Sequence, residues 1–318
     1  MNIGILGTGF MGKVHAQIYK SIPDVNIVGM AGRDVLHTTE IANDFETRAY
    51  KHPYDLINEK DIDAIDICVP SMFHTEFVVE ALKSGKHVFC ETPLTYDLED
   101  AIKMFEVSRK SDKKCMVALY DRFQSQYKYI YEYIKSGKLG KPKAVYANRR
   151  SQSHFASKDI ILNLMIHDFD YICWLLGKPK SVYCNGISTI EGINEHVNAI
   201  LEYDETSVTV EGSVIMPKTF PFSTSLRVVC EDGAIDLNWC WTDKGPVNDV
   251  ILYPSTGTAE KLEIVDYDPY EAECKYFVDC IKGNEDGTIL GIESALESVR
   301  VAVLARESFK QGGLKIQV

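Results

Sequence analysis

The chain has 318 residues, enough for two domains, and its 45% hydrophobic and 25% charged content is ordinary for a globular protein. A formal net charge of −12 argues against nucleic acid as a partner, because binding to a phosphate backbone usually needs a basic face. No apolar run is long enough to cross a bilayer, and the nine cysteines, without a Cys-x-x-Cys pair, predict reduced thiols in a cytoplasmic protein.

The first residues predict a strand, a glycine-rich turn and a helix. Asn2–Leu6 is apolar and β-branched, and a helical pattern runs from about Met11 to Tyr19. Gly7 permits the tight turn, Gly9 lets the backbone approach a pyrophosphate, and Gly12 lets the helix pack close to the strand. The expected cofactor-binding residues of this turn are Gly7, Thr8, Gly9, Phe10, Met11 and Gly12. A cleaved signal peptide is not expected, because its removal would destroy the turn.

Strand-like and helix-like segments alternate through the first third of the chain. The expected strands are Val25–Ala31, Ala64–Val69, His87–Cys90 and Cys115–Ala118, and the expected helices are Thr75–Ser84 and Leu98–Ser111. Such alternation predicts a doubly wound parallel sheet, a Rossmann fold, in a domain of residues 1–121. Ligands of these sheets bind at the carboxyl ends of the strands. The loops 70–74 and 91–94 are therefore expected to face the same crevice as the glycine turn.

The end of the second strand bears on the choice of cofactor. An acidic residue there usually holds the ribose 2′-hydroxyl of NAD, but the expected position holds Gly32. Arg33 could bind a 2′-phosphate, which favours NADP, and the alternative is a solvated surface arginine. Asp34 keeps NAD open if the register differs by one or two residues.

The pattern changes after about Tyr120. The expected elements are a helix Gln124–Ser136, a strand Lys143–Arg150, a helix Asp159–Leu176, and period-two strands between Ser181 and Val265 with a hairpin turn at Asp232-Gly233. Two helices, Tyr270–Lys282 and Ile292–Lys310, are expected to close the chain. This order predicts an α+β domain of residues 122–318 with a large, mainly antiparallel open sheet.

Five segments together resemble one known family. They are GTGFMGKVHA, VPSMFHTEFVVEAL, SGKHVFCETPLT, NLMIHDFDYICWLLG and ESALESVRVAVLARESFKQGG. The chain resembles the glucose–fructose oxidoreductase / inositol dehydrogenase / rhizopine-catabolism (Gfo/Idh/MocA) family over nearly its whole length. The resemblance implies NAD- or NADP-dependent chemistry on a hydroxyl or carbonyl of a sugar, cyclitol or related polyol. It also implies a homodimer or homotetramer formed through the open sheet.

Two departures from the family pattern concern the expected catalytic residues. The family usually has Glu-Lys-Pro where this chain has Glu91, Thr92 and Pro93, and threonine cannot supply the charge of that lysine. The family often has an aspartate four residues before a histidine, where this chain has Asn163 and His167. Because residues four apart share a helix face, both are expected to point into the crevice.

The resemblance gives these residues roles. His167 is the expected acid–base residue, because it titrates near neutral pH, and the alternative is a structural histidine. Asn163 and Thr92 are expected to orient the reacting oxygen. Glu91, Pro93 and Pro70 are expected to shape the loops against the cofactor, and His74 to contact the cofactor or to fix its loop.

Other polar residues carry weaker signals. Asp168 and Asp170 follow His167, but adjacent helical positions diverge, so no metal site is expected. Arg122 matches a family arginine at the domain junction and is expected to orient that junction or an anionic group. Three residues that precede the predicted catalytic helix, Arg149, Arg150 and His154, are interpreted as loop charges rather than as lining of a substrate pocket.

Three functions remain open at this point. The first is hydride transfer between nicotinamide and a sugar, cyclitol or related polyol. The second is cleavage or epimerisation of a glycoside by transient oxidation on a retained dinucleotide. The third is a non-catalytic dinucleotide-binding regulator, because the lysine and the helix aspartate of the family are both missing.

Overall fold

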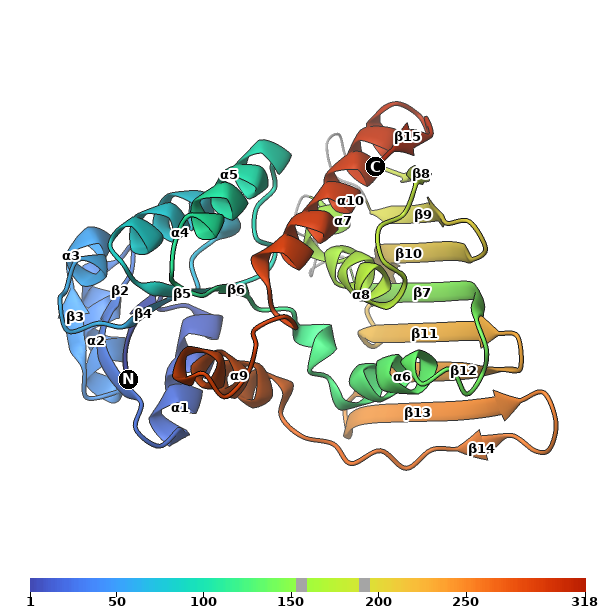
Figure 1. Cartoon of the computed structure of the whole chain (residues 1–318), viewed down its shortest axis with the longest axis horizontal. Coiled ribbons are helices and arrows are strands. Elements are labelled where there is room, and N and C mark those ends of the chain that lie inside the picture. Colours follow the sequence, from blue (N-terminus) through green and yellow to red (C-terminus); the bar gives the residue numbers. More distant parts are fainter. Residues whose placement is uncertain (153–158, 189–194) are drawn as a thin grey trace. The chain divides into compact units, whose positions relative to one another are not determined.

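The chain divides into two compact units. The computed structural model describes residues 1–152, 159–188 and 195–318, so the predicted pocket candidate His154 lies outside the described residues. The first unit comprises Met1–Phe123 with Asp268–Leu296, and the second comprises Gln124–Tyr267 with Glu297–Val318. Figure 1 shows the course of the chain through both units.

The first unit contains a six-stranded parallel sheet. Its strand order is β3-β2-β1-β4-β5-β6, the doubly wound arrangement predicted from the alternating segments. The strands are β1 (Asn2–Leu6), β2 (Asn26–Ala31), β3 (Arg48–Tyr50), β4 (Ala64–Ile67), β5 (His87–Cys90) and β6 (Cys115–Val117). The central strands β1 and β4 are apolar and buried, because helices cover both faces of the sheet.

Several helices of the first unit connect the strands of its sheet. The elements are α1 (Phe10–Ser21), α2 (Val35–Asp44), α3 (Pro53–Ile57), η1 (Ser71–Phe73), α4 (His74–Lys83), α5 (Leu98–Arg109) and η2 (Tyr120–Arg122). No element was predicted for residues 35–57, which form α2, β3 and α3. The helix α2 exposes much of its apolar surface, including Leu36 at 79%, so its sequence has little amphipathic pattern.

A late segment of the chain also belongs to the first unit. The helix α9 (Pro269–Lys282) packs against α1, and its Phe277 stacks on Phe89 of β5 with ring centroids 5.0 Å apart. The expected second domain, 122–318, therefore differs from the observed second unit, which lacks residues 268–296. The division falls inside α10 (Ile292–Lys310). Apolar packing between segments distant in sequence produces this assignment, which local patterns do not encode.

The second unit contains a nine-stranded, mainly antiparallel sheet, as predicted. The strand order is β14-β13-β12-β11-β7-β10-β9-β8-β15, and only β7 and β10 pair in parallel. The strands are β7 (Pro142–Gln152), β8 (Ser181–Ile187), β9 (His196–Glu202), β10 (Ser207–Met216), β11 (Ser223–Cys230), β12 (Gly233–Thr242), β13 (Gly245–Pro254), β14 (Glu260–Lys261) and β15 (Ile316–Gln317). The predicted hairpin turn joins β11 to β12, where Cys230 pairs with Gly233.

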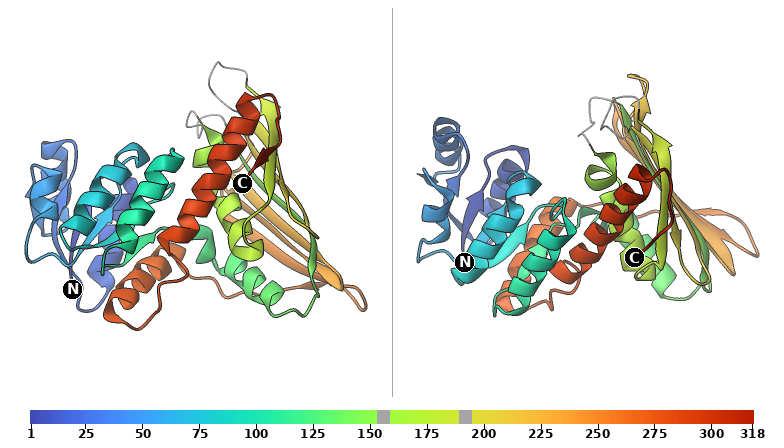
Figure 2. Two further views of the ribbon diagram at one scale, coloured as in Figure 1. Left: turned by 45° about the horizontal axis from the view of Figure 1, so that its top comes forward. Right: turned by 90° about the horizontal axis from the view of Figure 1, so that it is seen from above.

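Helices cover one face of the nine-stranded sheet and leave the other open (Figure 2). The covering helices are α6 (Ser125–Lys135), α7 (Ile160–Asn163), α8 (Ile166–Leu176) and the second-unit part of α10. In β7 the residues Val145, Ala147 and Arg149 alternate as buried positions toward the helices. Tyr146 lies between them and is 48% exposed.

The predicted single helix over residues 159–176 is wrong. The backbone N–H groups of Leu164 and Met165 both donate to the carbonyl of Ile160, at 2.9 and 2.8 Å, which widens the last turn of α7. Asn163 ends α7 and donates its side-chain amide to the carbonyl of Asp159 at 2.8 Å. A new helix, α8, begins at Ile166. Asn163 and His167 therefore do not share the face of one continuous helix.

Two further sequence expectations concern membranes and cysteines. Within the described residues, no helix combines the length and the apolar character that a membrane crossing requires. All nine cysteines are free thiols, and six of them, including Cys90 and Cys274, are buried.

Candidate active site

The glycine turn after β1 has the geometry that a dinucleotide loop requires. Gly7 has a φ of +111°, and a Cβ added there would lie 2.5 Å from the carbonyl oxygen of Cys68. A Cβ on Gly12 would lie 2.0 Å from the carbonyl oxygen of Gly7. At these two positions the protein's own backbone leaves no room for a side chain. A Cβ on Gly9, in contrast, would meet no atom within 4 Å, so this part of the turn faces open space.

The first turn of α1 leaves backbone donors available to a ligand. Gly9 precedes the helix and no side chain caps it, so the first N–H groups of α1 keep no side-chain acceptor. Phe10 is 73% exposed at the same turn, while Thr8 is buried. Free N–H groups and the positive end of the helix dipole suit a pyrophosphate. The residues present therefore fit a dinucleotide.

The end of β2 places the residues that bear on cofactor choice. Arg33 is exposed and has no ion-pair partner among the described residues. Asp34 caps α2, where one oxygen of its carboxylate accepts from the N–H groups of Leu36 and His37 at 2.9 and 3.1 Å. The His37 ring contacts the carbonyl of Thr8 at 3.2 Å through Nε2. Sequence reasoning missed His37, which ties α2 to the glycine turn.

His74 connects the loops that follow β4 and β5. Its side chain is buried, with Nε2 2.7 Å from the carbonyl of Val69 and Nδ1 3.1 Å from the carbonyl of Leu94. Burial lowers the pKa of His74, and a neutral ring carries one N–H, which donates to one carbonyl at a time. Both nitrogens face backbone, so the ring fixes the two loops. Pro70 is exposed on the first loop, and Pro93 is buried on the second.

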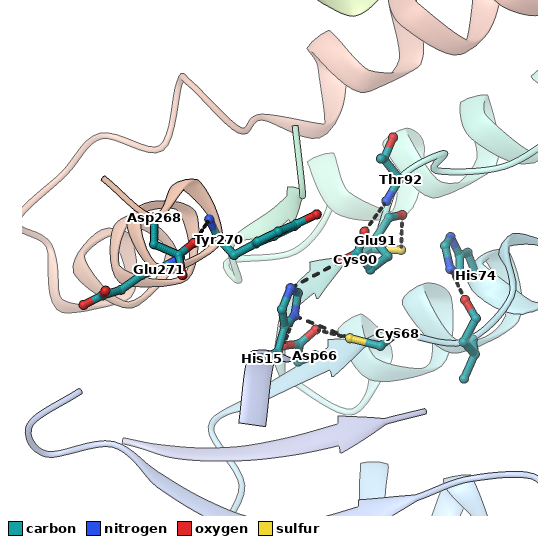
Figure 3. A network of polar contacts seen from close by, with 11 residues as sticks. His15, Asp66, Cys68, His74, Cys90, Glu91, Thr92, Asp268, Tyr270 and Glu271 are labelled. Carbon is teal, nitrogen blue, oxygen red and sulfur yellow. Dashed lines mark hydrogen bonds and ion pairs between the residues drawn. The ribbon is translucent and has the colours of Figure 1, made fainter. Parts of the chain in front are cut away.

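A buried ionic network lies below the second loop (Figure 3). His15 of α1 is fully buried and donates from Nδ1 to Asp66 of β4 at 2.8 Å. Its Nε2 lies 3.3 Å from Oε1 of Glu91, which directly follows β5. The other oxygen of Glu91 accepts from the backbone N–H of Thr92 at 3.1 Å. The chain Asp66–His15–Glu91 thus links the interior of the sheet to the backbone of Thr92.

The protonation of this network follows from its charges. Burial opposes a charge on His15, but its polar neighbours, the carboxylate of Asp66 foremost, together raise the pKa of His15 well above its ordinary value. Burial raises the pKa of the Cys68 thiol, which donates to Asp66 at 3.3 Å. Burial, and then the charge of Glu91, raise the pKa of Glu273 on α9 well above its ordinary value. These shifts favour the cationic form of His15, the thiol form of Cys68 and the neutral form of Glu273.

Sequence reasoning missed this network. One signal was available: Asp66 stands in the apolar strand Ala64–Ile67, and a carboxylate in such a place needs a buried partner. Among the described residues, one group has ligand atoms close enough to hold a metal ion, namely His15, Cys68 and Glu91, within 4.8 Å of one another. Carboxylates face both ring nitrogens of His15, an arrangement that suits a protonated ring.

The other predicted catalytic residues belong to the second unit. His167 is half-buried in the first turn of α8, and the next residue, Asp168, forms a buried ion pair with Arg149 of β7 at 3.2 Å. Asp170 accepts from Ser298 at 2.7 Å, so both aspartates have structural partners. Asn163 is half-buried at the end of α7.

The two other arginines singled out from the sequence also have partners. Arg122 is buried in the first unit and donates to the carbonyl of Ile289 at 2.7 Å and to Ser294 at 2.5 Å. It therefore holds the segment between α9 and α10. Arg150 pairs with Glu211 across β7 and β10.

Comparisons with known proteins agree with the family resemblance. Residues 1–119 match a family model described as an oxidoreductase family with an NAD-binding Rossmann fold, GFO_IDH_MocA. Residues 127–236 match a model of the GFO/IDH/MocA C-terminal domain. A myo-inositol 2-dehydrogenase from Thermotoga maritima is 31% identical over 195 residues, which are 58% of either chain. The match thus spans little more than half of that relative.

A second relative aligns over most of its length. The scyllo-inositol 2-dehydrogenase (NAD⁺) of Bacillus subtilis is 25% identical over 329 aligned positions, covering 97% of this chain and 94% of that protein. Among solved structures, a UDP-N-acetylglucosamine 3-dehydrogenase from Acidithiobacillus ferrooxidans superposes with a TM-score of 0.85 at 20% identity, covering 98% of each chain. An apo scyllo-inositol dehydrogenase from Lactobacillus casei gives 0.82 at 21% identity, covering 100% and 98%. At these identities, the structural likeness concerns the fold alone.

Proposed function

Because the chain belongs to the Gfo/Idh/MocA oxidoreductase family, with its NAD-binding Rossmann domain, we propose that it transfers a hydride at a CH–OH carbon of a sugar, cyclitol or related polyol. The glycine turn carries this proposal. Its closed positions at Gly7 and Gly12, and its open position at Gly9, match what a bound pyrophosphate needs. The inositol dehydrogenases among its relatives support the substrate class.

The dinucleotide supplies the hydride acceptor or donor when bound. Gly7, Thr8, Gly9, Phe10, Met11 and Gly12 would hold its pyrophosphate against the first turn of α1. Pro70, His74, Glu91 and Pro93 would bound the nicotinamide side through their two loops. Arg33 would bind a 2′-phosphate, since it is exposed and unpaired, while the carboxylate of Asp34 already caps α2. NADP is therefore our expected cofactor, with NAD the alternative.

Arg33 provides the test of cofactor choice. We expect Arg33→Ala to raise the KM for NADP by about tenfold or more, since a charge-assisted hydrogen bond contributes about 1.5–3 kcal/mol. The KM for NAD should change little, because NAD has no 2′-phosphate. Equal effects on both cofactors in initial-rate measurements would remove Arg33 from this role.

His167 would carry the substrate proton, and Asn163 and Thr92 would orient the reacting oxygen. A half-buried histidine can exchange a proton with a hydroxyl near neutral pH. Thr92 lacks the charge of the usual lysine, but its backbone N–H is held by Glu91, which His15 contacts in turn. The network would thus fix the loop that carries Thr92.

The main experiment follows absorbance at the nicotinamide band with a panel of inositols and sugars. We expect net NAD(P)H formation with a panel member, and a loss in kcat of about 10²–10⁴-fold in His167→Ala. His52→Ala is the matched control, because His52 is exposed and its side chain makes no capping hydrogen bond to α3. An unchanged kcat in His167→Ala would overturn the acid–base assignment.

Two other results of the same experiment would replace the proposal. Turnover of glycosides on a tightly retained dinucleotide, without net NAD(P)H change, would indicate cleavage or epimerisation by transient oxidation. Binding of the dinucleotide without any turnover would indicate a regulator. Both alternatives follow from Thr92, which lacks the charge of the lysine usual in the family.

We also expect a homodimer or homotetramer in the cytoplasm. The open face of the nine-stranded sheet exposes apolar side chains on several strands, among them Tyr146, Ile200 and Tyr253. Surfaces of this kind usually mark contacts between chains. Light scattering of the purified protein measures the number of subunits, and a monomer would contradict the expectation.

A further inference from the structure

The second unit contains a large cavity at one end of its sheet. It measures about 1000 Å³ and lies where β7 and β12 end and β11 begins. Every residue that lines it belongs to the second unit. Cavities of roughly 300–1,000 Å³ accommodate small-molecule ligands. None of the residues proposed above for hydride or proton transfer lines this cavity.

Aromatic rings form the apolar part of the cavity. Phe222 and Trp239 pack edge to face with centroids 6.0 Å apart, and Trp241 lies 6.1 Å from Trp239. Trp241 is 57% exposed, and Trp239 is half-buried beside it. Two neighbouring, partly exposed indole rings leave a contiguous apolar area in water, and such areas often mark ligand-binding sites. The negative face of an aromatic ring attracts the C–H groups of a sugar ring.

The polar rim of the cavity suits a neutral ligand. Its charged residues are one cation, Lys218, and one anion, Asp243, both exposed and without ion-pair partners among the described residues. Gln152 donates to the carbonyl of Phe220 at 2.7 Å, which leaves its side-chain oxygen as an acceptor. A phosphate group would meet one favourable and one unfavourable charge. A neutral ring with several hydroxyls would find both donors and acceptors.

Strand register connects this cavity to the proposed acid–base histidine. Arg149 of β7 lies opposite Thr224 of β11, which lies opposite Trp239 of β12. Directly opposed side chains share a face, and two strand spacings amount to about 10 Å. Arg149 forms its ion pair with Asp168, the residue that follows His167. Trp239 and Arg149 therefore lie on the same face of the sheet, and the ion pair between Arg149 and Asp168 joins this row to the first turn of α8, which carries His167.

A buried hydroxyl lies between them. Thr224 is 4% exposed, and its Oγ1 has no hydrogen-bond partner among the described residues. A polar atom left unpaired in this way usually has a partner absent from the structure, such as a ligand or water. The row from Arg149 to Trp239 therefore combines a charge, an unpaired hydroxyl and an aromatic platform.

We propose that the substrate is a glycosylated sugar or cyclitol, whose reacting ring lies by His167 and whose second, neutral sugar ring stacks on Trp239 and Trp241. This inference rests on the proposed function for the reacting ring. A free inositol or monosaccharide would leave the aromatic platform empty.

The test compares each ring with its glycosylated form on the purified full chain. The probes are glucose against cellobiose and maltose, and myo-inositol against galactinol, its galactoside. Binding is measured by quenching of tryptophan fluorescence, because two of the three tryptophans line the cavity. The third, Trp174, stacks on Tyr131. We expect a glycosylated probe to bind about tenfold more tightly than its parent ring.

Three variants distinguish stacking of the second ring on Trp241 from a general loss of ligand affinity. Trp241→Ala should abolish the difference between glycosylated probe and parent, while Trp241→Phe should retain most of it. Tyr54→Ala should leave the difference intact, because Tyr54 is exposed on α3 of the first unit, outside the cavity. The proposal is overturned if no glycosylated probe binds more tightly than its parent, or if Trp241→Ala weakens both equally. These titrations need no turnover, so a failure of hydride transfer remains distinguishable from a failure of stacking.

Discussion

The ionic network of the first unit and the aromatic cavity of the second unit are built in opposite ways. In the first, His15 and Asp66 are fully buried and bonded to each other, and backbone contacts fix the glycine turn beside them. In the second, Trp241 and Lys218 are exposed and few contacts hold them. This contrast indicates that the two regions have different functions. A rigid region would hold an invariant cofactor, and an open region would set the substrate.

The strongest test of this contrast removes a charge from the network. We expect Asp66→Asn to destabilise the first unit by about 3–5 kcal/mol, because it removes the nearer and fully buried of the two carboxylates that face His15. Asp61→Asn is the control, since Asp61 is exposed and should change stability by no more than about 0.5 kcal/mol. Chemical denaturation measures both variants.

The pH dependence of this variant gives a second readout. Because the folded pKa of His15 is raised, the ion pair stabilises the protein fully below the unfolded histidine pKa of about 6.5. That contribution is lost as pH rises through the raised folded pKa. The difference between wild type and Asp66→Asn should therefore be largest near or below about pH 6 and shrink at alkaline pH. A difference that is constant with pH would show that His15 is not the group concerned.

Substitutions of Gly12 and Gly9 test whether close backbone packing makes the glycine turn rigid. Gly12→Ala should destabilise by about 1–3 kcal/mol or more, because its Cβ would lie 2.0 Å from the carbonyl of Gly7. Gly9→Ala adds the same methyl group where no atom lies within 4 Å, so its Tm should stay near that of wild type. Cofactor affinity, measured by calorimetry, should nevertheless fall in Gly9→Ala, because the methyl group would occupy the pyrophosphate position. Equal Tm losses would contradict the assigned roles.

The contrast also explains what the sequence could predict. The parallel sheet and the glycine turn follow from local patterns, because strand, turn and helix succeed one another within Asn2–Ser21. The break between Asn163 and His167 does not, because it depends on a widened turn at Ile160 that helix periodicity does not reveal. The aromatic cavity depends on pairing between β11 and β12, and single-strand patterns show only an alternating strand.

The buried ionic network could be predicted only in part from the sequence. Asp66 could have been noticed as a carboxylate inside an apolar strand, but its partner His15 lies on another element. The place of Glu273 in this network is harder to predict, because α9 belongs to the first unit but lies near the end of the chain. Tertiary packing over such separations leaves no mark in local sequence. The family resemblance supplied the roles of His167 and Thr92, which remain predictions.

The smallest effect, with the opposite sign, is expected at Glu273. Its carboxyl is buried and both oxygens lack hydrogen-bond partners among the described residues. Since burial raises its folded pKa, the folded state binds a proton that the unfolded state releases above a pH of about 4.3. Glu273 therefore lowers stability progressively as pH rises from that value toward the raised pKa.

Glu273→Gln removes this titration while keeping the shape of the side chain. We expect its Tm at about pH 8 to exceed that of wild type by about 2–4 °C, with little difference near about pH 4. Calorimetric scans across this range measure the effect. Glu271→Gln, on the exposed face of α9, serves as the control. A variant that is less stable at every pH would mean that the ionised form of Glu273 is needed by the network, which would then bind a cation rather than enclose a neutral acid.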